Sequence, residues 1–240
     1  MGVIKRYRTA WSRFRRSHGF GIHSPFAFRF VLDVLCERLP YYAYAYIDGL
    51  RQAVVDAVRT GFWNHPRVIS AKNAKMLFRL ANYFNPRSIL QVGTSYGVSS
   101  ACMMVVNSNS RVWLYEPHLD RYPVVGRVLQ PFLERVEAYN DLSVALNDYD
   151  VALEGDEPFV LINDLPEGDD DLRVMTDKVR ELIDREAIIV MRNLSRSEAM
   201  RALWDVCREY GSHGQLFTND NLGVIVARRK FQREEFSLWF

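Results

Sequence analysis

The chain has 240 residues, of which 48% are apolar and 25% are charged, and its formal net charge is +2. This composition is that of a soluble globular protein, and the chain is long enough to bury a substantial core. The near balance of acidic and basic residues excludes a bulk charge that would by itself indicate a nucleic-acid partner.

Three cysteines, Cys36, Cys102 and Cys207, lie far apart in the sequence and within predicted helices. An odd number of distant cysteines fits neither a disulfide framework nor a zinc knuckle, so we expect buried thiols in a reducing compartment. No apolar run approaches the roughly 20 residues of a membrane span, and no signal-type apolar core follows the basic N-terminus. We therefore expect a cytoplasmic protein without a membrane span.

Residues 1–70 lack strand alternation and are predicted to form a helical N-terminal extension, which serves as a cap or lid or in dimerisation. The first helix has an apolar face opposite a basic one; the apolar residues are Ile4, Tyr7, Trp11 and Phe14. We expect this aromatic face to dock on the sheet domain or on a second subunit, which leaves a homodimer open. The alternative is a basic helix that binds nucleic acid or an anionic membrane, of which nucleic acid is not favoured.

Three further helices are predicted before the first strand. Ser24-Pro25 marks a helix start, because proline suits the first helical position. The next helix runs from about Tyr41 to Thr60, and Gly61 and Pro66 end it. The last runs from Ser70 to Phe84 and is stopped by Asn85-Pro86.

From Arg87 onward, short apolar runs alternate with helical segments, which indicates parallel strands joined by right-handed crossovers. A capping box at 195–198 predicts the start of the last helix. The final two strands form an antiparallel hairpin. The fold class is therefore α/β, with a Rossmann-like, mostly parallel sheet of seven strands over residues 71–240. The predicted strands are 88–92, 111–115, 135–139, 158–162, 187–191, 214–218 and 223–228.

The most informative turn follows the first predicted strand, where the apolar run stops at Gly93 and Gly97 comes four residues later. Glycines here let the chain turn into a helix with backbone N–H groups bare toward a ligand. Nineteen residues beyond Gly97, the second strand ends in Glu116, the usual position of a carboxylate that binds ribose hydroxyls. The two features together predict a nucleoside-containing cofactor; the alternative is that the glycines only make a tight turn.

Two motifs carry a family resemblance: "HGxGIHSPFxF" stands at 18–28, and "LExGTSxGxS" stands at 90–99 with Gln91 in place of the acid. They resemble the class I S-adenosylmethionine-dependent methyltransferases, in particular a bacterial branch related to the catechol-type O-methyltransferases. The resemblance implies a Rossmann-like sheet and an S-adenosylmethionine pocket at the carboxyl ends of the first strands. It assigns contacts with this cofactor to Gln91, Gly93, Thr94, Ser95, Tyr96, Gly97, Glu116 and Asp141, with Asn140 beside the last of them.

The chain departs from this family where catechol-type relatives bind a divalent cation with aspartates after the fourth and fifth strands. The corresponding residues here are Asn163, Arg192 and Asn193. A hard divalent cation requires several oxygen ligands, and an arginine among them would repel it. Asp164 could replace one ligand in a shifted register, but a single carboxylate beside Arg192 is a poor site. We therefore expect no divalent metal.

The resemblance and its departures predict a metal-independent S-adenosylmethionine-dependent methyltransferase of O-methyltransferase type, acting on an unknown small-molecule acceptor. Arg192 could replace the metal by neutralising an acidic or phenolate-type oxygen of the acceptor. By residue type alone, His23, Tyr96 and Asp164 are candidate bases. The alternative is a catalytically inactive protein of this fold that binds the cofactor, its demethylated product or a protein partner. The candidate catalytic residues are Arg192, Asn163, Asp164 and Asn193.

Overall fold

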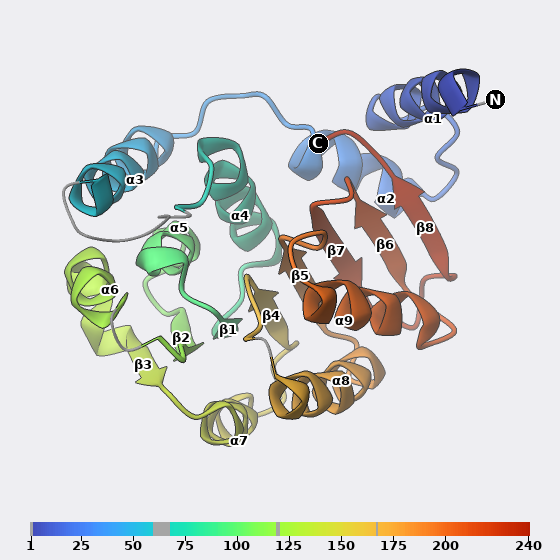
Figure 1. Cartoon of the computed structure of the whole chain (residues 1–240). Helices are drawn as coiled ribbons and strands as arrows, with labels where there is room; N and C mark the ends of the chain where they lie inside the picture. Colours follow the sequence, from blue (N-terminus) through green and yellow to red (C-terminus); the bar gives the residue numbers. More distant parts are fainter. Residues whose placement is uncertain (1, 60–67, 119–120, 167) are drawn as a thin grey trace.

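A sheet of eight strands lies between two layers of helices in the computed structural model, which describes residues 2–59, 68–118, 121–166 and 168–240 (Figure 1). The strand order is β3-β2-β1-β4-β5-β7-β6-β8. Strand β7 runs antiparallel to β5 and β6, and the other neighbours are parallel. The bounds are β1 Ser88–Val92, β2 Arg111–Tyr115, β3 Val136–Tyr139, β4 Phe159–Ile162, β5 Ile188–Arg192, β6 Gln215–Thr218, β7 Leu222–Val226 and β8 Glu234–Ser237.

The predicted Rossmann-like, mostly parallel sheet with an antiparallel hairpin is confirmed, but the predicted number of seven strands is wrong. The described chain adds β8, which pairs in parallel with β6 at the edge of the sheet. Within β8 only Phe236 is buried, and two glutamates precede it. One buried residue among four is too short a pattern for alternation to reveal the strand.

Helices cover both faces of the sheet (Figure 1). Because both faces are covered, β1, β4, β5 and β7 are buried at every residue. One face carries α2 Pro25–Phe30, the π-helix η1 Val31–Leu35, α3 Tyr44–Arg59, α4 Ala71–Phe84, α5 Val98–Met104 and α6 Tyr122–Leu129. The other carries α7 Leu142–Ala152, α8 Asp169–Asp184 and α9 Glu198–Glu209.

Helix starts follow local capping chemistry, with one correction. Ser24 caps α2 by accepting a hydrogen bond from the Ala27 N–H (3.2 Å), and Ser70 caps α4 in the same way. The cap of α9 is Ser197, whose Oγ accepts from the Met200 N–H (3.1 Å), so the predicted capping box that begins at Ser195 is wrong. The chain is still turning at Ser195 after β5, which delays the helix by two residues. Gly61 and Pro66 lie outside the described residues.

Helix α1 (Gly2–Ser17) lies beside the β8 edge of the sheet (Figure 1). Arg13 makes the contact: its Nε donates to Ser237 Oγ (2.7 Å) and its guanidinium pairs with Asp220. Tyr7 and Trp11 are 75% and 63% exposed, so these side chains do not dock on the sheet, and docking on a second subunit stays a prediction. The planar, fixed charge of arginine matches the carboxylate and hydroxyl at this edge better than the rings do.

The N-terminal helices share an apolar core with the sheet. The Phe30 ring of α2 lies 4.9 Å from the Phe217 ring of β6, and both are fully buried. The division of the chain at residue 70 stays a prediction. The three cysteines are free thiols; Cys102 and Cys207 are buried as expected, and Cys36 is half-buried. Over the described ranges, no helix combines the length and the hydropathy that crossing a membrane requires.

Candidate functional site

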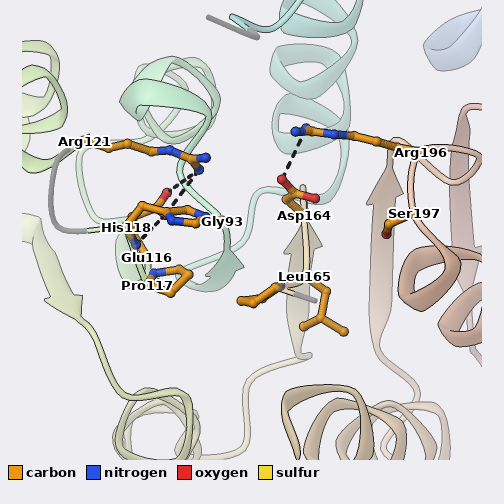
Figure 2. A pocket seen from close by; sticks show the side chains of 10 residues that line it. Gly93, Glu116, Pro117, His118, Arg121, Asp164, Leu165, Arg196 and Ser197 are labelled. Carbon is orange, nitrogen blue, oxygen red and sulfur yellow. Dashed lines mark hydrogen bonds and ion pairs between the residues drawn. The ribbon is translucent and has the colours of Figure 1, made fainter. Parts of the chain in front are cut away.

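The candidate site lies at the carboxyl ends of β1 and β4, where the strand order reverses direction. A crevice forms at such a switch point because the crossover connections leave to opposite sides. Two cavities that share Gly93, Arg121, Asp164 and Arg196 occur here, with volumes of about 560 and 50 Å³. Figure 2 shows the larger one, lined by Gly93, Glu116, Pro117, His118, Arg121, Asp164, Leu165, Pro166, Arg196 and Ser197.

The turn between β1 and α5 holds four residues in the left-handed region: Gly93, Ser95, Tyr96 and Gly97, with φ of 79°, 47°, 58° and 82°. Serine and tyrosine cost about 1–2 kcal/mol each in this conformation. The Ser95 Oγ is also buried without a hydrogen-bond partner in the described part of the chain. Strained backbone and an unpartnered hydroxyl lie beside the smaller cavity, as is typical of a ligand site.

The two glycines of this turn have different neighbours. A Cβ at position 93 would lie 3.2 Å from both the N and the O of Asp164, so β1 and the end of β4 approach closely only because residue 93 is glycine. A Cβ at position 97 would lie 3.1 Å from Leu129 Cγ of α6. Gly97 therefore serves helix packing, and Gly93 is the glycine that lines the cavity.

Gln91 supports the turn from inside the protein. Its Nε2 donates to the Gly93 carbonyl (2.9 Å) and to Ser99 Oγ (2.9 Å), and its Oε1 accepts from Ser100 Oγ (2.8 Å). The side chain is 0% exposed. Both polar atoms of the amide are thus bonded within the protein, which fits a role in holding the turn.

Glu116 is buried (1% exposed) and bonded to the glycine turn. Its Oε2 accepts from the Thr94 N–H (3.1 Å) and from Thr94 Oγ1 (2.6 Å), while its Oε1 accepts from the His118 N–H (3.0 Å). Arg121 lies on the same side of the cavity and forms an ion pair with this carboxylate at 3.2 Å (Figure 2). The carboxylate has few free lone pairs, so a ribose diol can bond to Glu116 only where Arg121 withdraws.

The residues at the ends of β4 and β5 bond to one another and to the turn. Asn163 Nδ2 donates to the Gly93 carbonyl (2.7 Å), and Asn163 Oδ1 accepts from a terminal nitrogen of Arg192 (2.5 Å). Asn193 Nδ2 donates to the Asn163 carbonyl (2.8 Å). The sequence-predicted group of Asn163, Arg192 and Asn193 is therefore brought together. Where the structure describes side chains, no three His, Cys, Asp or Glu residues are grouped as metal ligands would be.

Arg192 is a buried cation, with 4% of its surface exposed and its Nε without a hydrogen-bond partner among the described residues. Burial lowers the pKa of Arg192 to about 10, and burial raises the pKa of the nearby Cys102 thiol to about 12. At neutral pH the guanidinium is therefore charged and the thiol is neutral. A positive charge thus lies at the end of β5 and holds Asn163 in place.

Asp164 supplies a carboxylate to the cavity and is 26% exposed. Arg196, in the loop before α9, forms an ion pair with it at 3.2 Å, and the two side chains face each other (Figure 2).

Sequence reasoning missed Arg121 and Arg196. The available signal was weak: each is a cation in a loop that follows a strand end.

Two predicted groups lie apart from the cavities. Asp141 is exposed and caps α7, where its Oδ1 accepts from the Val144 N–H (3.1 Å), and the neighbouring Asn140 is exposed as well. His23 is exposed just before α2, which packs on β6 toward the far edge of the sheet (Figure 1).

Tyr96, by contrast, lines the smaller cavity. It is buried in the turn, with the Arg121 guanidinium 6.0 Å from the centre of its ring.

Comparison with known proteins rests on structure, since neither protein-family models nor curated protein sequences match the chain. A cofactor-bound protein from MTB, Rv0187, is 19% identical and superposes with a TM-score of 0.57 over 81% of this chain and 100% of its own. An O-methyltransferase from Bacillus cereus in complex with SAH is 17% identical and superposes with a TM-score of 0.51 over 82% of this chain and 96% of its own. The SAH-bound Podospora anserina methyltransferase PaMTH1 is 13% identical and superposes with a TM-score of 0.52 over 79% of this chain and 97% of its own. The chain therefore has the fold of class I methyltransferases, as the sequence motifs led us to expect.

Proposed function

We propose that the chain is an S-adenosylmethionine-dependent methyltransferase that acts on a small-molecule acceptor without a divalent metal. The proposal rests on one observation: Thr94, in the glycine turn, donates two hydrogen bonds to the Glu116 carboxylate. These groups lie beside a cavity of about 560 Å³. The fold is shared with methyltransferases crystallised with SAH. Below 25% identity this likeness supports the fold alone, so the site must support the function.

The residues of the site fit this cofactor. Once Arg121 withdraws, Glu116 can accept from ribose hydroxyls, and Pro117, Leu165 and Pro166 offer apolar surface for a base. Ser95 Oγ, which has no partner among the described residues, can bond to the polar end of the cofactor. The two arginines of the cavity, Arg121 and Arg196, are each paired with a carboxylate, which suits a ligand without phosphates.

S-adenosylmethionine supplies an electrophilic methyl group on a positively charged sulfur. Methyl transfer then depends mainly on holding the acceptor oxygen in line and removing its proton. Asp164 faces the cavity beside Arg196, and an Oδ atom of its carboxylate can accept this proton. Asn163, Arg192 and Asn193 position the end of β4, and thereby Asp164.

Metal independence is supported by the charge at the end of β5. Where relatives of the catechol type would hold a cation, Arg192 places its own positive charge against Asn163 Oδ1. A divalent cation at this position would lie next to the Arg192 guanidinium, and the two positive charges would repel strongly in a buried site. We expect magnesium to bind neither here nor through Asp164, which Arg196 already neutralises.

Calorimetric titration with S-adenosylmethionine and S-adenosylhomocysteine tests the proposal, once with a chelator and once with added magnesium. We expect micromolar binding of both ligands, unchanged by magnesium, followed by turnover with small acidic or phenolic acceptors. Failure of both ligands to bind would reject the proposal. Stimulation by magnesium would reject metal independence, and binding without turnover across the acceptors would favour the inactive alternative.

Arg121 is expected to compete with the cofactor for Glu116. The Arg121→Ala variant should bind S-adenosylhomocysteine about tenfold more tightly, because no ion pair has to be broken first, whereas Glu116→Gln should bind it at least tenfold more weakly. Calorimetry on both variants measures the two changes. A loss of affinity in Arg121→Ala would mean that Arg121 contacts the ligand directly.

Asp164→Asn is expected to reduce turnover by roughly 100-fold or more, which is the usual contribution of a general base, while it keeps the affinity for S-adenosylhomocysteine within a few-fold. Asp220→Asn is the matched control, because Asp220 also pairs with an arginine but lies in the turn between β6 and β7 and lines neither cavity of the site. Steady-state methyl transfer to whichever acceptor the screen identifies measures the effect. Equal turnover in Asp164→Asn and the wild-type protein would exclude Asp164 as the base.

A further inference from the structure

A further cavity, of about 850 Å³, lies between α1, the segment after η1, α4 and the last residues of the chain. It shares no lining residue with the candidate methyl-transfer site. Its volume falls within the range of about 300–1,000 Å³ that is typical of small-molecule sites. Rings and cations line it together: Phe14, Tyr44, Trp239 and Phe240, and Arg38, Lys72, Lys75 and Arg79.

Arg79 carries a buried charge that no carboxylate neutralises among the described residues. The side chain is 8% exposed. Its Nε donates to the Val34 carbonyl (2.6 Å), and its terminal nitrogens donate to the Leu35 carbonyl (3.3 Å) and to Tyr44 Oη (3.0 Å). These acceptors satisfy the N–H groups but leave the positive charge in place. A buried cation of this kind favours an anion nearby.

Lys72 and Lys75 precede Arg79 on one face of α4, since residues three, four and seven apart lie on one side of a helix. Lys75 pairs with Asp48 (2.7 Å), but Lys72 forms no ion pair within the described ranges, and neither does Arg38. The carboxylate of Glu37, which also lines the cavity, accepts instead from the backbone N–H groups of Arg38 and Leu39. The cavity therefore has a net positive charge.

Arg38, Lys72 and Arg79, which form no ion pair with the described residues, line this cavity together with Cys36. Burial raises the pKa of the Cys36 thiol there, and Arg79, Lys72 and Arg38 each act in the opposite direction. The three charges therefore act on the same part of the cavity, and their field favours an anionic group bound near Cys36.

Aromatic rings line the same cavity and keep part of their surface free. Phe14 and Trp239 are half exposed to solvent, and Tyr44 lies between Lys75, whose Nζ is 5.1 Å from the ring centre, and Arg79. Rings offer apolar surface to a flat ligand with little loss of conformational freedom. A ligand suited to this cavity thus combines a flat apolar body with a negative charge.

We propose that this cavity is a binding site for a small aromatic molecule that carries a carboxylate or a phosphate group. The ring lies among Phe14, Tyr44 and Trp239, and the anionic group lies beside Lys72, Arg38 and Arg79. The site is separate from the cavity of methyl transfer and does not depend on that proposal.

Calorimetric titration of the full chain with 1-naphthoate, 1-naphthyl phosphate and the uncharged 1-naphthalenemethanol tests the site. We expect at least one of the two anions to bind at least tenfold more tightly than the alcohol, with a change in tryptophan fluorescence that Trp239→Phe removes. The stronger of the two identifies the preferred anionic group. Saturating S-adenosylhomocysteine should leave this binding unchanged. Equal affinity for the alcohol, or no binding of either anion at millimolar concentration, would overturn the proposal.

Lys72→Met and Arg38→Met are expected to weaken binding of the preferred anion about tenfold each, the effect of one charge-assisted contact. Both residues sit at the cavity without an ion pair to the described residues, so the fold should tolerate their loss, which circular dichroism checks. Lys230→Met is the matched control, because Lys230 is exposed and lies over Phe231, away from this cavity. If Lys230→Met weakens binding as much, the effect is one of net charge and the site is rejected.

Discussion

Gly93→Val is expected to abolish binding of S-adenosylhomocysteine. Gly93 has a φ of 79°, which a β-branched residue hardly adopts. A Cβ would lie 3.2 Å from the backbone N and O of Asp164, which cannot rotate away. The Gly93 carbonyl also accepts from Gln91 and Asn163, so a displaced turn would disturb both supports. We expect a loss of at least about 2 kcal/mol in the free energy of unfolding from backbone strain alone.

Calorimetry with S-adenosylhomocysteine and thermal unfolding measure these two effects. Gly93→Ala is the milder variant for the case that Gly93→Val does not fold, and it should still bind about 100-fold more weakly, or roughly 3 kcal/mol. Gly126→Ala is the matched control: in α6 a Cβ at this position meets no atom within 4 Å. It should retain full affinity and gain about 0.5–1 kcal/mol of stability from its helical position. Full affinity in folded Gly93→Val would show that the turn is not part of the site.

Gly223→Ala is expected to destabilise the protein by about 3 kcal/mol, the upper range for overpacking a core. Gly223 lies in β7, opposite Met191 of β5 and Thr218 of β6. A Cβ here would lie 2.4 Å from Cζ3 and 2.5 Å from Cη2 of Trp204, whose ring packs on the sheet from α9. The ring is buried, so it has little room to move. The clash outweighs the gain that alanine normally brings over glycine in a strand.

A double-mutant cycle with Trp204→Leu tests this contact directly. In the Trp204→Leu background, Gly223→Ala should cost less than about 1 kcal/mol, because the shorter side chain leaves room for a methyl group. Chemical denaturation of the four proteins gives the coupling energy. If Gly223→Ala costs the same in both backgrounds, the destabilisation does not arise from Trp204.

Local patterns were sufficient for the strands that carry the site. The runs that end at Val92, Tyr115 and Ile162 are mostly apolar because both faces of these strands are buried, and the glycine turn follows β1 directly. The same patterns were insufficient at β8, where one buried phenylalanine follows two glutamates. They also misplaced the cap of α9, since two serines two residues apart are both chemically able to cap.

Sequence reasoning grouped Gln91 with the residues that bind the cofactor; that contact stays a prediction, and in the structure the side chain bonds to the turn and to α5. Successive residues of a strand point to opposite faces. Gln91 points into the layer of α5 and bonds to Ser99 and Ser100. The cavity lies instead beyond the strand end, where Gly93 and Asp164 meet. The strand position is predictable from the sequence, but whether a polar side chain there faces helix or ligand depends on which helix covers it.

By itself, the sequence determined the α/β class, the position of the glycine turn and the carboxylate at the end of β2, because each depends on residues adjacent in the chain. Only the tertiary structure decided that Arg121 pairs with Glu116, that Arg196 pairs with Asp164, and that α1, α4 and the last residues of the chain enclose a further, cationic cavity. Arg121 and Glu116 are only five residues apart, but the Asp164–Arg196 pair and the cationic cavity join loops and helices from distant parts of the chain. Their geometry follows from how the helices pack on the sheet, and no local pattern of residues encodes it.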